Sequence, residues 1–474
     1  MYVRDSLIEL LYHSLTSASI LTLNPPKRIS TSSLVNAQIW SPHDSVTTTG
    51  GRHNVSCISY EVQFICDCAM VDEDLVLPHL IGSAYQLEIR NCKSLTIESN
   101  ALQDTQHLHK ITFKNVENLI LSQYALSLPD YSSSTPLILS FEKVKVKLID
   151  SLAINGQIEE ITIVDSYIES IRPFAFNILK NNALRLTMDR VTINRIEPQA
   201  FKKLVVEKID IQNCEFLQNV PSKTFYDIEV SDSLYLSKCR FKKVHTKAFS
   251  FKMISKLTIA NNYFEAIDGE WLEAYVKKSP QIRDNQFGNT SVIAFAGIKV
   301  HRDYGSSEKL ELRFSNNTIY FPYDNVRPLE FSRDFTLNLK QLTVNNPYPC
   351  SSVDDNTQPL RPTSEFYNLH QHNVYFRQDG NAAAHDNRGV SGYKPLNEII
   401  ASDCVKHSYV LYIIIGVVVF VVLIALIIVI ACWLAAKKRK AKRKMDIIQP
   451  EPRTYKETQI VYQIENAGLL KTDF

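Results

Sequence analysis

The chain has 474 residues, a length that suits a large repeat architecture with added segments better than one small domain. Its 52 basic and 50 acidic residues give a formal charge of +2. This charge is uneven, because residues 437–474 hold ten basic and five acidic residues, a local +5, which leaves −3 for residues 1–436. A main part without excess positive charge argues against nucleic acid as the partner.

Residues 1–50 form the least regular segment. The short apolar stretch at the start is interrupted by Glu9 and His13, and Ser17-Ala18-Ser19 offers a small-residue cleavage site. The segment is a weak signal peptide, an artefact of the assigned start or a plain disordered extension, and the residues leave these three alternatives open. Residues 25–49 are polar and rich in Ser and Thr without periodicity, which predicts disorder.

Residues 84–344 repeat one pattern of apolar positions about every 24 residues. The clearest copy is Leu234–Phe249, where the alternation of Leu234 and Leu236 predicts a short strand with one buried face. The apolar positions that continue this buried face as the chain bends away and returns are Cys239, Phe241, Val244, Ala248 and Phe249. Such a period predicts a solenoid, in which each coil buries its apolar face against the next.

Eleven strand pairs follow from this period. They are Leu87/Ile89, Ile111/Phe113, Leu139/Phe141, Ile161/Ile163, Leu184/Leu186, Ile209/Ile211, Leu234/Leu236, Leu257/Ile259, Pro280/Ile282, Leu312/Phe314 and Leu337/Leu339. The pairs expected to return under the core on the opposite side include Ala101-Leu102, Ala125-Leu126, Ala153-Ile154, Ala175-Phe176 and Ala200-Phe201. Residues 289–308 lengthen one interval, and we expect them to form a loop projecting from one edge.

These repeats resemble the extracellular leucine-rich repeat (LRR) motif LxxLxLxxNxLxxIPxxAF. The resemblance implies an α/β-type solenoid, a horseshoe of about 11 repeats with a parallel concave β-sheet. It also places Cys92, Cys214 and Cys239 at the inward position where the family carries a ladder of asparagines, as Asn262, Asn285 and Asn317 do here. Cys214 and Cys239 would be close enough to bridge, but side chains in register point in parallel, so we expect free buried thiols.

Cysteines flank the repeats. The spacing of Cys57, Cys66 and Cys68 in residues 51–83 resembles the N-terminal cysteine cap of extracellular LRR proteins, which covers the exposed edge of the first coil. The next cysteine, Cys92, lies inside the first repeat, so the pairing stays open. A zinc site is the competing interpretation, but no second matching pair of cysteines supports it.

Residues 345–408 are expected to form a C-terminal cap and stalk. Asn345–Cys350 resembles the opening of the family's C-terminal cysteine cap, and the resemblance implies Cys404 as the mate of Cys350. Residues 351–403 are polar, with scattered Gly and Pro, and predict a loose structure.

The run Tyr409–Ala436 is uncharged and longer than the roughly 20 residues that cross a bilayer. The basic cluster Lys437–Lys444 follows it directly. By the positive-inside rule, residues 437–474 form a cytoplasmic tail and the long N-terminal part lies outside the cell. The sequence therefore predicts a single-pass type I protein of the plasma membrane.

Several short motifs predict modification or sorting. Sequons for N-glycosylation occur at Asn54, Asn289 and Asn316, and Cys432 is a candidate for palmitoylation. Glu465, Leu469 and Leu470 resemble an acidic dileucine signal for a sorting adaptor, and Thr472–Phe474 resembles a C-terminal PDZ ligand. Each tail motif is short enough to occur by chance.

The outward residues of the predicted concave strands are the candidates for a ligand-binding face. They are Glu88, Arg90, Lys114, Asn115, Asp165, Arg185, Asp210, Gln212, Tyr235, Lys238 and Asn261. Their mixed charge suits a polar protein or glycan partner, whereas an ordinary solvated sheet face accounts for most of them without any ligand.

Two functions follow as expectations: a cell-surface receptor or co-receptor that binds a protein ligand, or an adhesion protein that binds an ectodomain on the next cell. A parallel β-helix that cleaves polysaccharides is a third class. It would require carboxylates stacked at one repeat position, which the sequence lacks, so we expect no enzyme and no cofactor or metal.

Overall fold

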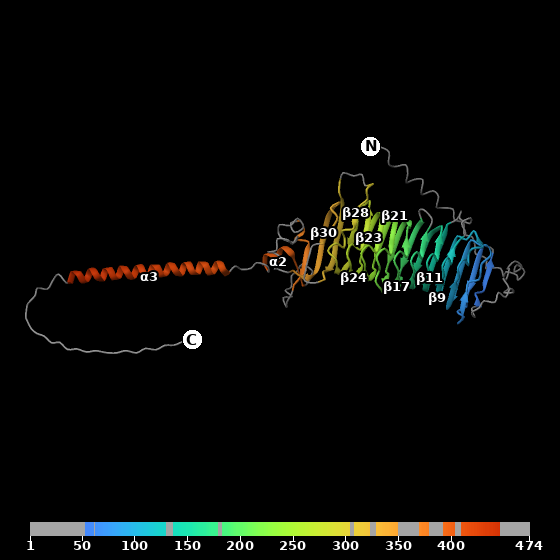
Figure 1. Ribbon diagram of the computed structural model, residues 1–474, viewed down its shortest axis with the longest axis horizontal. Coiled ribbons are helices and arrows are strands. Elements are labelled where there is room, and N and C mark those ends of the chain that lie inside the picture. Colours follow the sequence, from blue (N-terminus) through green and yellow to red (C-terminus); the bar gives the residue numbers. More distant parts are fainter. Residues whose placement is uncertain are drawn as a thin grey trace, which may run out of the picture. The chain divides into compact units, whose positions relative to one another are not determined.

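The computed structural model describes residues 53–60, 62–128, 136–178, 183–303, 308–322, 329–348, 369–378, 392–402 and 409–445. The chain divides into two compact units, Met1–Cys404 and Val405–Phe474. The first is a parallel β-solenoid of about 11 turns, whose strands stack side by side from β9 (Lys110–Leu121) to β30 (Phe335–Pro347) (Figure 1). The described part of the second is the helix α3 (Tyr409–Met445).

Three strand ladders run along the solenoid. The first ladder contains the predicted concave strands, and its inward residues are the predicted apolar pairs. Its members are β2 (Cys57–Tyr60), β3 (Gln63–Asp67), β6 (Gln86–Cys92), the first halves of β9 and β11 (Leu137–Ile149), β13 (Ile158–Val164), β16 (Ala183–Asp189), β19 (Val205–Gln212), the last parts of β21 (Phe225–Ser237) and β23 (Phe249–Ala260), β26 (Gln281–Arg283), and the first halves of β29 (Leu310–Tyr320) and β30.

The second ladder follows the first corner of each coil. Its members are β1 (His53–Asn54), β4 (Asp74–Val76), β7 (Ser94–Ile97), the second halves of β9 and β11, β14 (Tyr167–Ile171), β17 (Thr192–Ile196), β20 (Glu215–Phe216), β22 (Arg240–Val244), β24 (Tyr263–Ile267), β27 (Gln286–Thr290), the second halves of β29 and β30, and β31 (Val374–Arg377).

The third ladder returns the chain under the core. Its members are β10 (Leu126–Ser127), β12 (Ile154–Gly156), β15 (Phe176–Ile178), β18 (Phe201–Lys202), the beginnings of β21 and β23, β25 (Leu272–Val276) and β28 (Ile298–Val300), while β5 (Gly82–Ser83) and β8 (Thr105–Gln106) pair separately.

The returning segments are strands, not helices. The described part of residues 53–348 contains no α-helix, so the helical component of the expected α/β-type solenoid is absent there. Phe176, Phe201, Phe225 and Phe249 stack in one column with ring centroids 4.3, 4.6 and 4.9 Å apart. This spacing matches that of adjacent strands, so extended returns let every ring pack on the next.

Most predicted strand pairs are confirmed, but one register is wrong. Leu186 and Met188 align with the inward pair Ile161 and Ile163 of the preceding coil, whereas Leu184 is exposed. Because leucines stand at both 184 and 186, the apolar alternation alone fits a register shifted by two residues.

The predicted loop at residues 289–308 is largely part of the solenoid. Residues 292–297 form turns that lead into β28, which pairs with β25 of the preceding coil. Phe295 is buried among Phe287, Phe314 and Phe331. An aromatic residue that fills the core explains why this coil is longer, and residues 304–307 lie outside the described residues.

A polar ladder runs through the core beside the first corner. Cys92, Cys214 and Cys239 and the asparagines 262, 285 and 317 are all buried there, as predicted. Asn262, Asn285 and Asn317 donate to backbone carbonyls one coil back at 2.9–3.0 Å, and their Oδ1 atoms accept from the preceding coil. Cys214 and Cys239 are free thiols, and burial raises the pKa of the Cys239 thiol.

The first coil begins earlier than predicted. β3 pairs in parallel with β6, placing Phe64 and Cys66 at the inward positions of Leu87 and Ile89. Residues 51–83 therefore contain a full coil in addition to the cap. The cap is the antiparallel strand β2. Two disulfides hold this end together, Cys57–Cys66 and Cys68–Cys92.

Replacing Cys68 by Ser is expected to lower the free energy of unfolding by about 3 kcal/mol, because the Cys68–Cys92 bond closes a loop of 24 residues. Denaturant unfolding of the full chain measures this loss. Cys432→Ser, which removes a free thiol of α3, serves as the control. Equal unfolding midpoints for the two variants would contradict the Cys68–Cys92 pairing.

The C-terminal end is covered more firmly than the predicted loose cap. β31 continues the second ladder, and β32 (Tyr393–Pro395) pairs with it antiparallel. Helix α2 (Leu396–Ser402) buries Leu396 and Ile399 against the core. The predicted partners Cys350 and Cys404 lie outside the described residues.

Candidate interaction surfaces

The outward face of the first ladder is a regular surface that runs along the solenoid. A central row of outward residues follows from the strand register: Glu88, Thr112, Ser140, Thr162, Thr187, Asp210, Tyr235, Thr258, Gln281, Arg313 and Asn338. Hydroxyl side chains occupy the row from Thr112 to Thr187, and all but one of the side chains from Asp210 to Asn338 are larger polar groups. From β6 to β30 the face therefore offers hydrogen-bonding groups without any large apolar area, whereas Ile58 and Tyr60 of β2 expose apolar side chains at its N-terminal edge.

Three predicted ligand-face residues lie together at the N-terminal end of this face. Arg90 and Lys114 are register partners on β6 and β9, and Arg90 lies 3.4 Å from Glu88 and 2.7 Å from Asp67. Burial acts to raise the pKa of Asp67, but hydrogen bonds from the Ala69 backbone, Arg90 and Asn91 outweigh it and lower that pKa. Arg90 is thus partly neutralised by its own neighbours.

A second group of predicted residues lies in the middle of the face. Asp210 and Tyr235 are neighbours in the central row, and Gln212 donates to Asp210 at 2.7 Å. Arg185 lies on the adjacent strand. Four strand spacings separate Arg90 from Arg185, about 19 Å, so the predicted residues form two groups on one face.

The remaining candidates occupy the corner between the first and second ladders. Asp165, Lys238 and Asn261 follow directly after their strands, and Asn115 lies at the bend within β9; all four have φ between 50° and 58°. The corner column with this left-handed backbone comprises Asn91, Asn115, Lys143, Asp165, Arg190, Asn213, Lys238, Asn261, Asp284, Asn316 and Gln341. Seven of these eleven are Asn or Asp, the types that best tolerate this conformation after Gly, so turn geometry explains them.

Six of the eleven corner side chains bind one another. Asn115 donates to Asn91 at 3.0 Å, and Asn316 donates to Asp284 at 2.7 Å. Arg190 binds Asp165 through two nitrogens, and its hydrogen bond is the main cause that lowers the pKa of Asp165. These residues bind the coils together and present few free groups to a ligand.

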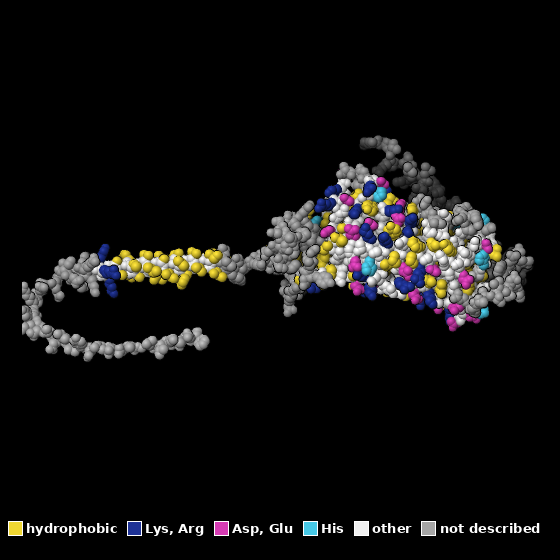
Figure 2. Space-filling model, in the orientation of Figure 1, with side chains coloured by type: hydrophobic (Ala, Val, Ile, Leu, Met, Phe, Trp, Pro, Cys, Tyr) yellow, Lys and Arg dark blue, Asp and Glu magenta, His cyan; other side chains and the backbone are white. Residues whose placement is uncertain are grey.

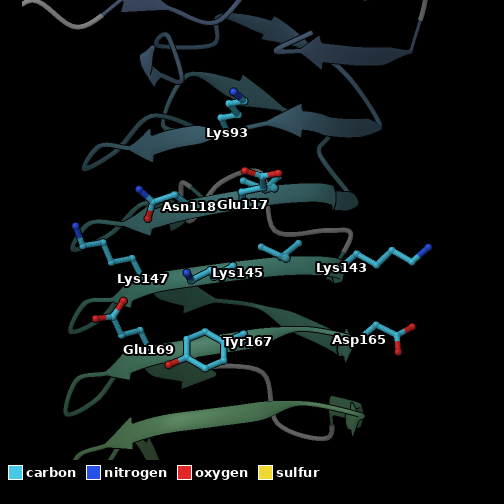
Figure 3. Close-up of a pocket in the computed structure, with 11 residues that line it drawn as sticks. Lys93, Glu117, Asn118, Lys143, Lys145, Lys147, Asp165, Tyr167 and Glu169 are labelled. Carbon is cyan, nitrogen blue, oxygen red and sulfur yellow. The ribbon is translucent and has the colours of Figure 1, made fainter. Parts of the chain in front are cut away.

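A shallow groove of about 690 Å³ lies on the second ladder, where β9, β11 and β14 meet (Figure 3). Lys145 occupies its centre, with Tyr167 on the next strand, and the two are 5.8 Å apart from amine to ring centroid. Lys143, at the corner within β11, and Lys147, in its second half, point away from each other (Figure 3). Sequence reasoning missed this groove, although the alternation of lysines at 143, 145 and 147 signals an outward basic strand.

The groove is nearly balanced in charge. Its lining includes four lysines, at 93, 143, 145 and 147, and three carboxylates, Glu117, Asp165 and Glu169. Charges of both signs are also mixed over the face of the solenoid seen in Figure 2. A groove lined by nearly equal numbers of positive and negative side chains does not select for an anionic ligand.

All three sequons lie on the second ladder or its corner. Asn54 is in β1 and Asn289 is in β27, at opposite ends of that ladder, and Asn316 is in the corner column. All three side chains are exposed. The outward face of the first ladder carries no sequon between its two edges.

The carboxylate arrangement expected of a polysaccharide-cleaving β-helix does not occur in the described ladders. No register position of the three ladders holds Asp or Glu in three consecutive described coils. Among the described residues, no cluster of His, Cys, Asp and Glu is arranged to hold a metal ion.

One described helix is long and apolar enough to cross a membrane. It covers Tyr412–Lys440, with mean hydropathy 3.8 over its most apolar window. Its apolar side chains form an unbroken band that ends at a basic cluster (Figure 2). Cys432 lies on this helix, whereas Glu465, Leu469 and Leu470 lie outside the described residues.

The geometry thus offers one open polar sheet face, one charge-balanced groove and one apolar helix. Comparison of the chain with protein-family models, with curated proteins and with solved structures finds no match in any of the three.

Proposed function

We propose that the protein is a single-pass cell-surface receptor or co-receptor of the leucine-rich repeat type, which binds a protein ligand through the outward face of the first ladder. Support for the repeat type comes from the period of about 24 residues and from the hydrogen-bonded ladder Asn262, Asn285 and Asn317. The strands of the third ladder depart from the expected α/β type.

The observation that carries the binding proposal is the distribution of sequons. Glycans at Asn54 and Asn289 would lie at the two ends of the second ladder, and one at Asn316 would lie at its corner, where a bulky, hydrated chain blocks protein contacts. The face of the first ladder stays open, and Asp210, Gln212 and Tyr235 form a connected polar and aromatic group at its middle. Tyrosine surrounded by polar groups is typical of protein-binding hot spots.

The membrane placement rests on α3 and on the charges that follow it. An apolar span followed by Lys437–Lys444 favours a cytoplasmic C-terminus and an extracellular solenoid. The disulfides of the first coil fit an oxidising compartment outside the cytoplasm.

The test uses cells that display the full chain, screened with soluble, tagged secreted proteins and ectodomains. We expect a ligand whose binding weakens about tenfold or more in Tyr235→Ala, as for a hot-spot side chain. Lys145→Glu, in the groove of the second ladder, is the matched control and should bind normally. Binding that is lost in Lys145→Glu and kept in Tyr235→Ala would contradict the proposal.

The second candidate function is adhesion to a like or unlike ectodomain on a neighbouring cell. Labelled and unlabelled non-adherent cells displaying the chain are mixed, with non-expressing cells as the control. Clumping only among expressing cells would favour adhesion over a soluble ligand.

A further inference from the structure

The exposed apolar side chains of the solenoid are concentrated at its N-terminal end. Among the described residues 53–348, the five most exposed large apolar side chains are Ile58, Tyr60, Val62, Ile81 and Tyr85, with 49, 63, 63, 59 and 50% of their surface exposed. We call this set the N-terminal apolar patch. The backbone carbonyl of Val62 accepts hydrogen bonds from Tyr85 and Gln86, which joins the two sides of the patch.

The patch borders an open strand edge. β2 pairs with β3 and with no other described strand. Cys57 and Cys66 face each other with their Cα atoms 4.1 Å apart, the close approach of a pair that exchanges no backbone hydrogen bonds. By the alternation of an antiparallel ladder, Ser59 and Phe64 are also such a pair, so the N–H and C=O of Ser59 point to the open edge.

The two ends of the solenoid differ in this respect. At the C-terminal end, the antiparallel strand β32 and helix α2 close the last coil. At the N-terminal end, the strand sequence Cys57–Tyr60 contains no charge, no proline and no lysine to discourage pairing. An uncharged edge with exposed apolar side chains is a site where another strand adds.

We propose that β2 pairs antiparallel with β2 of a second copy of this chain, joining the first ladders of two solenoids across a twofold axis. A twofold axis at a sheet edge places the edge strand antiparallel to the same strand of the second copy, so the two copies of β2 can pair directly. Ile58 and Tyr60 then meet their counterparts on one face, and the absence of charge in β2 avoids repulsion between like groups.

The size of this contact indicates a reversible dimer. The pairing brings Ile58 and Tyr60 of both copies together directly. The exposed surface of all five side chains, roughly 100 Å² each, sets an upper limit of about 500 Å² per copy and about 1,000 Å² in total, the lower limit for a specific interface. Asn54 lies nearby in sequence but in β1 of the second ladder, so a glycan there flanks the open edge of β2. Ile58 and Tyr60 lie on the outward side of β2, so the dimer contact continues the N-terminal edge of the ligand face, away from Asp210, Gln212 and Tyr235 at its middle. It does not depend on the proposed receptor function.

The test places a photo-crosslinking amino acid at position 60 of the full chain, co-expressed in cells with a second copy that carries a different tag. We expect illumination to give a product of twice the chain mass that contains both tags. Ser59→Pro removes the outward N–H without removing a bond to β3, and we expect it to reduce the product at least tenfold. The crosslinker at Tyr320, an exposed tyrosine of the second ladder, should give only the monomer.

Equal surface display of each variant excludes misfolding as the cause, and Ile58→Asp provides an independent disruption of the patch. Three results would overturn the proposal: an adduct with a different protein, an internal crosslink to residues 1–52, or a double-mass product that Ser59→Pro and Ile58→Asp leave unchanged. The absence of any product at position 60 would overturn it as well.

Discussion

Phe249→Ala is expected to lower the free energy of unfolding by about 3–5 kcal/mol, the usual cost of removing a buried phenylalanine ring. Phe249 is 3% exposed, stacks on Phe225 at 4.9 Å and meets Phe241 and Trp271 edge-on. Its loss opens a cavity between two columns of rings that the flanking strands hold at fixed spacing. Thermal or denaturant unfolding of the full chain measures the effect.

The matched control is Phe174→Ala, because Phe174 is 38% exposed and contacts the amine of Lys202 at 4.7 Å. Its loss should change the free energy of unfolding by less than about 1 kcal/mol. Similar losses for the two variants would show that the aromatic column is not part of the stabilising core.

Asn285→Ala is expected to lower the free energy of unfolding by about 3 kcal/mol or more. The side chain is 1% exposed; its Oδ1 accepts from the backbone and side-chain nitrogens of Asn262, and its Nδ2 donates to Ile259 and Asn317. Alanine leaves the Asn262 backbone N–H and the Ile259 carbonyl buried without these partners, at about 1–3 kcal/mol each.

Asn194→Ala is the control for this experiment. Asn194 is half-buried on the second ladder and accepts one hydrogen bond, from Gln218 at 3.3 Å. We expect a change within about 0.5 kcal/mol. If Asn285→Ala destabilises the chain no more than Asn194→Ala, the buried polar ladder does not hold the coils together.

The inward face of the first ladder could be predicted because burial constrains alternate residues of a strand. Leu234 and Leu236 are apolar for that reason. The same alternation correctly predicts that Tyr235, and Asp210 and Gln212 on the adjacent strand, lie on the outward face. Strand ends carry no such signal. Asp165 and Asn261 were therefore placed on the sheet, although their left-handed backbone puts them at the corner.

Short or unusual segments could not be predicted by alternation. The strands of the third ladder, such as Phe176–Ile178, are too short to show a period of two, and Phe295 lies in turns that fill the core. The first coil was missed because Cys66 replaces the usual aliphatic residue. The open edge of β2 depends on which strands pair, which no local pattern specifies.

The central claim is that the solenoid lies outside the cell, and N-glycan mapping of the full chain expressed in cultured cells tests it most directly. The account predicts that glycosidase treatment lowers the apparent mass and that Asn54→Gln, Asn289→Gln and Asn316→Gln each remove one glycan. Gln38→Ala, which alters no sequon, should leave the mass unchanged. A chain that reaches the membrane with no glycan at any of the three sites would contradict the account.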